Sequence, residues 1–324
     1  SGREPSPCRS VPPALPRLQT GEVTPHRRPP RTRLAEAMRL VMTLLVRDEA
    51  DIVRENLDFH FAQGIDFAIV MDNGSTDGTA EILEEYAARG LIRLIHRPGA
   101  FDPEPWVNEL VGIAIREEGA DWVLPNDADE FWLPRAGTLK ELLATLPDEI
   151  GAVVAQRHNF LPAPEGPEPW WERMTRRARV SLNAHGRPLP PKIVHRTHPG
   201  LRIRRGNHRR MPPREGRVLR TDAVEVLHFQ MRSYAQFERR VIQIGSALVG
   251  RDDLPERVGR ARKLQYELWK EGRLREAYEA AALESDAVED TRLRDALLVL
   301  RSMPAPIPGS DRGPDATPLA GAGL

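Results

Sequence analysis

The stretch Arg39–Thr79, RLVMTLLVRDEADIVRENLDFHFAQGIDFAIVMDNGSTDGT, decides the fold. It begins with the mostly apolar run 40–46, which is typical of a strand buried on both faces. Apolar residues at helical spacing follow over 49–64, and Gly64 is suited to end that helix. A second apolar run over 65–72 predicts another strand. A strand, a helix and a strand in this order predict two parallel strands joined by a right-handed crossover.

The same alternation continues along the chain. Further helices are predicted at 76–90, 105–119 and 138–147, and further strands at 91–97, 120–127, 151–160, 222–231 and, as a short piece, 201–205. Regular alternation of this kind predicts an α/β fold, in which a mostly parallel sheet of the Rossmann-like type carries helices on both faces.

Composition divides the chain into four parts. The ends lack periodicity and are rich in Pro with Arg, or in Pro, Gly and Ala, so we expect them to be disordered, with the chain's natural start near Met38 or Met42. Residues 233 onward mix charged and apolar residues at helical spacing, which predicts a helical C-terminal extension. The expected parts are a tail at 1–37, an α/β domain at 38–232, the extension at 233–302 and a tail at 303–324.

Charge and cysteine content exclude several classes of protein. Lys+Arg and Asp+Glu both number 47, so the net charge indicates no partner. The single cysteine, Cys8, excludes an internal disulfide framework and a cysteine metal site. The apolar run 40–46 is far shorter than the ~20 residues that span a bilayer. We therefore expect a cytoplasmic protein without a signal peptide, with room for peripheral contact at the inner face of a membrane.

One block of the chain is strongly basic. Between Glu172 and Arg220 there are 15 Lys and Arg residues against two acids, Glu172 and Glu215. Such a block favours an anionic ligand, which can be a nucleotide phosphate, a phosphorylated lipid or a nucleic acid.

Polar residues follow the predicted strands, where an open parallel sheet binds its ligands. After the second strand, MDNGSTDGT places Asp72 where it can accept hydrogen bonds from a base or a ribose. Gly74 and Gly78 permit a tight turn, and Ser75 or Asp77 can cap the next helix. An ordinary turn between a strand and a helix explains the same residues equally well.

The fourth strand ends in NDADEFW, which carries the carboxylates Asp127, Asp129 and Glu130. Carboxylates this close repel one another unless a cation lies among them. Asp127 and Asp129 can together reach one Mg²⁺ or Mn²⁺, for which oxygen ligands are suited. We expect such a metal, and a gain in metal-free stability if either aspartate is removed. Phe131 is expected in the core. The alternative is a polar turn with exposed acids.

The stretch RDEADIVRENLDFHFAQGIDFAIVMDNGSTDGT followed by NDADEFW resembles the GT-A glycosyltransferases, and most closely their family-2-like bacterial branch with an Asp-x-Asp-Glu-Phe motif. The resemblance covers roughly 40–237 and includes PKIVHR, GNH and LHFQMRSYAQF. It implies a nucleotide-binding α/β sheet whose Asp-x-Asp pair holds a divalent metal on the diphosphate of a nucleotide-sugar. The chain departs from the pattern at Asp48, where the family commonly has Asn.

The resemblance also implies roles for individual residues. Asp127 and Asp129 would bind the metal and the ribose or diphosphate, and a late histidine, His228 or else His208, would complete the metal site. The residues implied near the nucleotide-sugar are Glu49, Asp72, Asn73, Asp77, Asp127 and Lys192. A lone histidine is about as often a satisfied structural residue.

An inverting enzyme needs a general base for the acceptor hydroxyl. Glu172 is the candidate, because it is one of the two acids in the basic block and the neighbouring Trp170 and Trp171 could stack on a sugar. A surface glutamate in a loop is the alternative.

Three functions remain open. The first is a glycosyltransferase dependent on Mn²⁺ or Mg²⁺, with a UDP- or GDP-sugar donor and a saccharide, a lipid-linked saccharide or a cell-envelope polysaccharide as acceptor. The second is a sugar-phosphate nucleotidyltransferase, but VRDEAD lacks the glycine-rich loop of that class. The third is an Arg-rich nucleic-acid-binding protein. That class needs exposed aromatics interleaved with the basic residues, so no nucleic acid partner is expected.

Overall fold

The computed structural model describes residues 35, 37–99, 102–182, 186–208, 215–249, 259–283 and 286–302. All of them belong to one unit, Arg31–Leu324. The predicted disordered tails at 1–37 and 303–324 lie outside the described residues, apart from Ala35 and Ala37.

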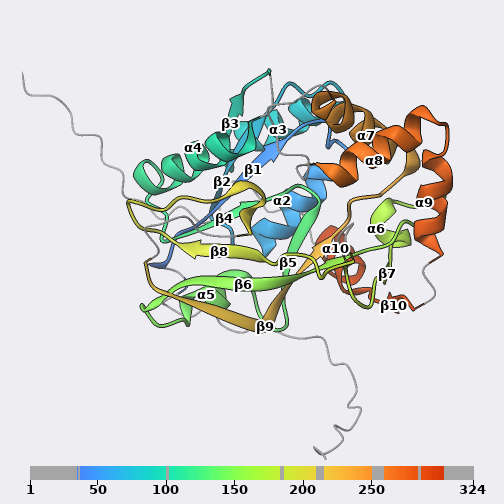
Figure 1. Ribbon diagram of the computed structural model, residues 1–324. Helices are drawn as coiled ribbons and strands as arrows, with labels where there is room; N and C mark the ends of the chain where they lie inside the picture. Colours follow the sequence, from blue (N-terminus) through green and yellow to red (C-terminus); the bar gives the residue numbers. More distant parts are fainter. Residues whose placement is uncertain are drawn as a thin grey trace, which may run out of the picture. The chain divides into compact units, whose positions relative to one another are not determined.

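The described part of the chain contains an eight-stranded sheet in the order β3-β2-β1-β4-β8-β6-β9-β5 (Figure 1). Its strands are β1 (Leu40–Val46), β2 (Phe67–Asp72), β3 (Ile92–His96), β4 (Trp122–Asn126), β5 (Glu130–Pro134), β6 (Ile150–Asn159), β8 (Lys192–Arg196) and β9 (Arg217–His228). β1 pairs in parallel with β2 and β4, and β2 with β3. β8 runs antiparallel between β4 and β6, β6 is parallel to β9, and β5 closes the edge antiparallel to β9. The predicted α/β fold with a mostly parallel sheet is confirmed.

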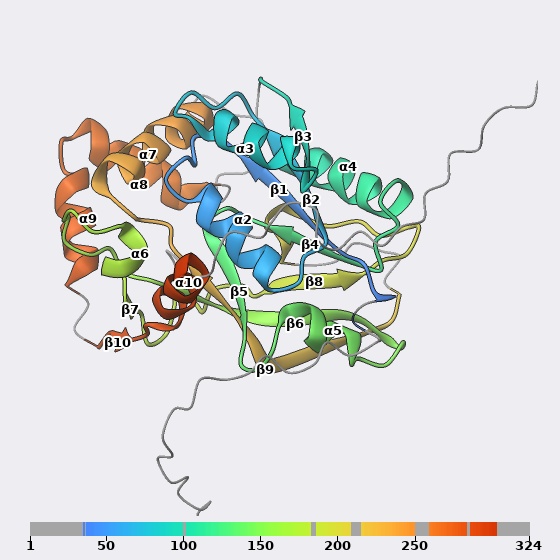
Figure 2. The same ribbon diagram turned by 180° about the vertical axis from the view of Figure 1, so that it is seen from behind.

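Helices cover both faces of this sheet, as the fully apolar strands require. α2 (Val53–Ala62), α3 (Thr79–Ala88) and α5 (Leu139–Ala144) lie on one face, and α4 (Pro103–Arg116) lies on the other (Figure 2). Alternate residues of β1 show the division. Met42 packs in the same cluster as Leu57 of α2, whereas Val41 packs in the cluster of Leu110 and Val111 of α4.

Several segments differ from the sequence prediction. β5 and β8 were not expected as strands, and the short strand expected at 201–205 is wrong, since a 3₁₀ turn, η1 (Arg205–Asn207), begins there instead. β5 forms because its backbone pairs with β9, with Glu130 opposite His228. That partner lies almost 100 positions away, so no local pattern marks the strand.

The helices expected after Ser233 are present as α7 (Tyr234–Leu248), α8 (Arg260–Lys270), α9 (Leu274–Ala282) and α10 (Arg292–Ser302). Figures 1 and 2 show α7, α8 and α9 grouped at one end of the sheet. α7 and α9 share a small apolar cluster of their own, whereas Leu293 and Leu297 of α10 are buried in the main core. The short strands β7 (Arg176–Arg177) and β10 (Val288–Glu289) pair with each other. Among the described residues, no helix has the length and apolar character needed to cross a membrane.

Candidate active site

The carboxyl ends of β2, β1 and β4 lie side by side, because these strands are parallel neighbours in that order. The loops that follow them therefore meet at one edge of the sheet, as expected for ligand-binding loops. Direct contacts join the loops after β1 and β2: the amide of Asp48 donates to Ser75 Oγ at 2.9 Å, and the amide of Glu49 donates to Thr79 Oγ1 at 2.8 Å. The predicted acidic residues are thus brought to one region.

Asp48 joins these loops rather than facing a ligand. Its backbone is left-handed, with φ of 54°, a conformation that Asp tolerates better than most residues. Its carboxylate accepts hydrogen bonds from the amide of Thr76 at 2.8 Å and from the side chain of Gln243 on α7. The departure from the family pattern at this position therefore keeps a hydrogen-bonding side chain.

Asp77 and Asn73 also hold the loops. The carboxylate of Asp77 accepts from the amides of Ala50 and Thr79, both at 3.1 Å, and from the Thr79 hydroxyl at 2.6 Å. The side-chain amide of Asn73 donates to the carbonyls of Arg97 and Gly99, at 2.8 and 3.1 Å. Both residues were predicted to bind the nucleotide, and both lie at the expected edge of the sheet. Much of their hydrogen-bonding capacity, however, is used within the protein.

Asp72 ends β2 and is buried. One carboxylate oxygen accepts from the Ser75 hydroxyl at 2.5 Å, and the other lies 3.7 Å from Nδ1 of the half-exposed His96. His96 was not predicted as a site residue. It ends β3 and lies opposite Asp72 of the parallel strand β2, so it belongs to the same edge of the sheet.

The three neighbouring carboxylates, Asp127, Asp129 and Glu130, form what we call the acidic cluster. Lys192 Nζ lies 2.6 Å from Asp127 Oδ2 and 3.0 Å from Glu130 Oε2. Arg157 Nη1 lies 3.1 Å from Glu130 Oε1. Lys192 and Glu130 are buried, whereas the side chain of Asp127 is 56% exposed and open to a ligand.

Asp129 is buried and lies between an arginine and a histidine. Arg240 Nη1 of α7 lies 2.6 Å from Asp129 Oδ2, and His228 Nε2 lies 3.4 Å from the same oxygen. Burial alone would raise the pKa of Asp129, but Arg240 and His228 hold it well below its ordinary value. For Glu130, burial dominates and raises the pKa despite Lys192. Asp129 therefore carries a firm negative charge.

These contacts correct the expectation that the acidic cluster needs a metal to relieve repulsion. Each of its carboxylates already has a cationic partner from the chain itself: Lys192 for Asp127, Arg240 for Asp129, and both Lys192 and Arg157 for Glu130. On removing Asp129 we now expect a loss of metal-free stability in place of the predicted gain, because Arg240 and His228 would be left without their carboxylate partner.

Two residues of the acidic cluster, together with His228, nevertheless fit a divalent cation. Asp129, Glu130 and His228 each offer a ligand atom, and these atoms lie within 4.8 Å of one another. His228 Nδ1 donates to Asn159 Oδ1 at 2.6 Å, so Nε2 is the ring nitrogen left to bind a metal beside Asp129. Metal-binding histidines are commonly oriented by such a second hydrogen bond. Carboxylate oxygen with imidazole nitrogen suits Mn²⁺, and carboxylates suit Mg²⁺.

Asp129 and His228, two of the predicted metal ligands, are thus adjacent, while the other two lie outside this group of the described residues. Asp127 faces Lys192, and His208 Nδ1 donates to the carbonyl of Pro191 at 2.9 Å. Burial and the charge of Lys192 lower the pKa of His208 to about 4, which keeps its ring neutral. Glu130 was not predicted as a ligand, although it follows Asp129 directly.

Glu49 is held by a buried arginine, Arg232. Arg232 is fully buried and donates to Glu49 Oε2 at 2.5 Å, to both oxygens of Asp51 at 2.8 Å, and to the carbonyl of Phe229 at 3.0 Å. Burial raises the pKa of Glu49, and the charge of Arg232 opposes that rise. Sequence reasoning missed Arg232, because nothing near it in the chain distinguishes it from the many surface arginines.

Glu172 lies half-buried on the one-turn helix α6 (Trp170–Arg173). The expected sugar-stacking surface beside it is wrong, because Trp170 and Trp171 are both buried in the core. The indole of Trp170 donates to the carbonyl of Asp51 at 2.8 Å, and the guanidinium of Arg301 covers the ring of Trp171 at 4.9 Å. Within the described part of the chain, no contact places the Glu172 carboxylate against the acidic cluster.

Arginines from the C-terminal helices add positive charge beside Asp129. Arg240 comes from α7, and Arg262 comes from α8, which packs on α7. Burial, together with the nearby charge of Arg240, lowers the pKa of Arg262 to about 9. A cation destabilised by other cations favours a neighbouring anion.

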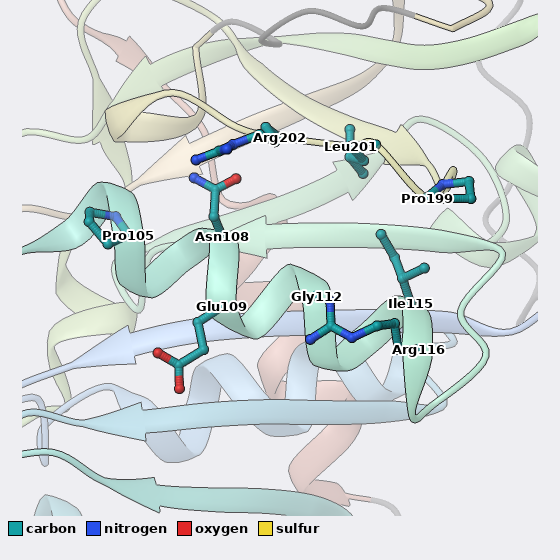
Figure 3. Close-up of a pocket in the computed structure, with 10 residues that line it drawn as sticks. Pro105, Asn108, Glu109, Gly112, Ile115, Arg116, Pro199, Leu201 and Arg202 are labelled. Carbon is teal, nitrogen blue, oxygen red and sulfur yellow. The ribbon is translucent and has the colours of Figure 1, made fainter.

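A cavity of about 640 Å³ lies elsewhere, between α4 and the segment 199–202. Figure 3 shows Asn108 of α4 pointing toward Arg202 across it. Asn108 is already bonded to the backbone of Ile203, with its Nδ2 donating to the carbonyl at 2.9 Å and its Oδ1 accepting from the amide at 2.8 Å. No predicted site residue lines this cavity, so it is separate from the acidic cluster.

Comparison with known proteins adds the following. The family model described as Glycosyl transferase family 2 matches residues 45–210, just over half of the 324 residues. No curated protein matches. Among solved structures, S. aureus TarS 1–349 with UDP is 16% identical, with a TM-score of 0.38, over 71% of this chain and 69% of that one. Another S. aureus TarS structure is 16% identical, with a TM-score of 0.34, over 73% of this chain and 43% of that one.

Glucosyl-3-phosphoglycerate synthase from Mycobacterium tuberculosis, solved with Mn²⁺, uridine diphosphate and glucosyl-3-phosphoglycerate, is 20% identical, with a TM-score of 0.29. The match covers 41% of this chain and 50% of that one. The region matched by the family model contains β2, β3, β4, β8 and the acidic cluster, and it begins at the end of β1. The chain belongs to glycosyl transferase family 2 and is a glycosyltransferase.

Proposed function

We propose that this glycosyltransferase depends on Mn²⁺ or Mg²⁺ and transfers a sugar from a UDP- or GDP-sugar, with inversion, to a saccharide or to a lipid-linked or cell-envelope acceptor. The observation that carries the proposal is the pairing of buried Asp129 with His228, whose Nδ1 is held by Asn159 so that Nε2 faces the carboxylate. Membership in the family favours this reading over a nucleotidyltransferase or a nucleic-acid-binding protein.

Asp129 and His228 would hold the divalent cation, with Glu130 beside them. When bound, the cation would neutralise the negative charge that develops on the departing diphosphate. Asp127 is exposed and would contact the ribose or the diphosphate. Asp72 would accept hydrogen bonds from the base, while Asn73 and Asp77 would shape the loop that receives it.

Cations of the chain would share in binding the diphosphate. Arg157, Lys192 and Arg240 each contact a carboxylate of the acidic cluster, and Arg262 lies near Arg240. Donors of positive charge that are already in place stabilise a leaving group without costly rearrangement. Glu172 stays the proposed base for the acceptor hydroxyl, and contact of the basic block with a membrane surface stays part of the proposal.

A thermal-shift panel tests this function. UDP, GDP, CDP and dTDP are each added with and without Mn²⁺, and the melting temperature is recorded. We expect one nucleotide to raise the melting temperature only when Mn²⁺ is present, because a ligand that binds the native state alone stabilises it by mass action. At 100 times its Kd such a ligand adds about 2.7 kcal/mol.

Two variants control the panel. Asp129→Asn should lose the Mn²⁺-dependent shift, and Glu172→Gln should keep it while losing sugar transfer. A panel in which no nucleotide shifts the wild-type protein, with or without Mn²⁺, would contradict the proposed donor site.

A further inference from the structure

Arg240 forms an ion pair with Asp129, the carboxylate that the proposed metal site requires. Its guanidinium lies 2.6 Å from Asp129 Oδ2, and His228 Nε2 lies 3.4 Å from the same atom. A divalent cation held by Asp129 and His228 would therefore meet the charge of Arg240 at close range. Two cations on one buried carboxylate repel each other strongly, since the surroundings screen them less than water does. Arg240 and the metal therefore compete for Asp129.

The helix that carries Arg240 is fixed in place by other contacts. Gln243, one turn further along α7, donates to the carboxylate of Asp48 after β1, and Arg239 Nη2 lies 4.0 Å from Asp77 after β2. On another side of α7, Phe237 and Val241 are buried against α9. These contacts hold α7 without Arg240, so the arginine side chain can change its partner while the helix stays where it is.

A second anionic partner for Arg240 arrives with the donor. The side chain of Arg240 is 24% exposed, so it reaches both buried Asp129 and the solvent-facing side of the site. Asp127, two positions before Asp129 in the chain, is open to a ligand. A diphosphate at this place offers oxygen atoms that bind a guanidinium in a forked geometry. The donor can therefore take Arg240 from Asp129 at the moment when the metal needs that carboxylate.

We propose that Arg240 is an exchangeable counterion that couples metal binding to donor binding. Without donor, Arg240 neutralises Asp129 and keeps the affinity for a free divalent cation low. With donor, Arg240 moves to the diphosphate and the metal takes its place on Asp129. This inference rests on the metal site of the proposed function and assigns to α7, outside the matched family region, a role in loading that site.

The exchange predicts opposite effects on two measured affinities. Removing Arg240 should strengthen the binding of metal alone, because nothing then competes for Asp129. It should also reduce the gain in metal affinity that a nucleotide brings, since part of that gain comes from the release of Asp129. Coupling between two ligands is reciprocal. The gain in nucleotide affinity that added metal brings should therefore fall by the same factor.

The test is titration calorimetry of Mn²⁺ into the full chain, first alone and then with saturating UDP or GDP, whichever stabilises the wild-type protein. Arg240→Gln should bind Mn²⁺ alone about tenfold more tightly than wild type, as loss of one charge-assisted hydrogen bond to the carboxylate predicts. The factor by which the nucleotide strengthens Mn²⁺ binding should fall by about the same tenfold. Arg294→Gln, which removes the same charge from α10, where Arg294 pairs with the neighbouring Asp295, should match wild type.

Arg240→Lys is the second variant, because it keeps the positive charge at this position. It should retain weak binding of Mn²⁺ alone, and it separates loss of charge from any disturbance of α7. Unchanged or weaker Mn²⁺ binding by Arg240→Gln, or an unchanged effect of nucleotide, would overturn the exchange while leaving the metal site intact. Failure of wild type to bind Mn²⁺ with either nucleotide would overturn the proposed function and the exchange together.

Discussion

Replacing Asp129 with Asn is expected to lower kcat/KM for sugar transfer by about 10²–10³-fold, the loss typical when one group that stabilises developing negative charge is removed. Asn keeps the size of the side chain but has no charge with which to bind a divalent cation beside His228. The measurement is steady-state transfer from the donor that the nucleotide panel selects, at saturating Mn²⁺.

The matched control is Asp148→Asn, at a fully exposed aspartate. That variant should keep the wild-type rate. Asp129→Asn should also melt at a lower temperature than wild type without metal, because Arg240 then loses its carboxylate partner. Wild-type turnover in Asp129→Asn would contradict a catalytic cation held by Asp129.

Replacing Arg232 with Met is expected to lower the free energy of unfolding by about 3–5 kcal/mol, the usual cost of breaking a buried ion pair on one side. Arg232 is fully buried and holds Glu49 and Asp51, which would lose their cationic partner without it. The Met side chain fills part of the space, so the loss reports mainly on the unpaired carboxylates. Chemical denaturation followed by circular dichroism measures the change.

Arg93→Met serves as the comparison for Arg232→Met. Arg93 pairs with Glu117 at the surface, where both side chains are more than 40% exposed, and such pairs contribute about 0–1 kcal/mol. Equal losses in the two variants would contradict the structural role of Arg232. A loss confined to Arg232→Met would show that the loop after β1 depends on an arginine from 183 positions further along the chain.

The sheet and the place of the site could be predicted because both depend on local pattern. Apolar runs and helical spacing are read within 10 to 15 residues, and parallel strands bring their carboxyl ends together whatever the loops contain. That is why Asp72 and the acidic cluster were expected at one edge of the sheet. Phe131 was also expected in the core, and it is fully buried there.

The partners of the acidic residues could not be predicted, because they come from distant parts of the chain. Arg157, Arg232 and Arg240 look like surface arginines in the sequence. The sheet brings Arg157 of β6 to Glu130, and the turn from β9 into α7 brings Arg232 to Glu49 and Arg240 to Asp129. The burial of Trp170 and Trp171 was missed for a related reason. A pair of tryptophans in an irregular segment gives no periodic signal that separates a core position from an exposed surface.

The sequence pattern offers two late histidines as metal ligands, and only the structure separates them. His208 and His228 both match the family resemblance, and their separation in sequence favours neither. The pairing of β5 with β9 places His228 opposite Glu130 and beside Asp129, whereas η1 turns His208 toward the backbone of Pro191. The choice between them therefore depends on strand register, which a single sequence does not reveal.

The metal site is tested most directly by anomalous X-ray scattering from crystals grown with Mn²⁺ and the nucleotide that stabilises the protein. The account predicts one manganese peak that contacts both Asp129 and His228, with the guanidinium of Arg240 on the diphosphate. A manganese peak held by Asp127 and His208, or nucleotide bound with no manganese near Asp129, would contradict it.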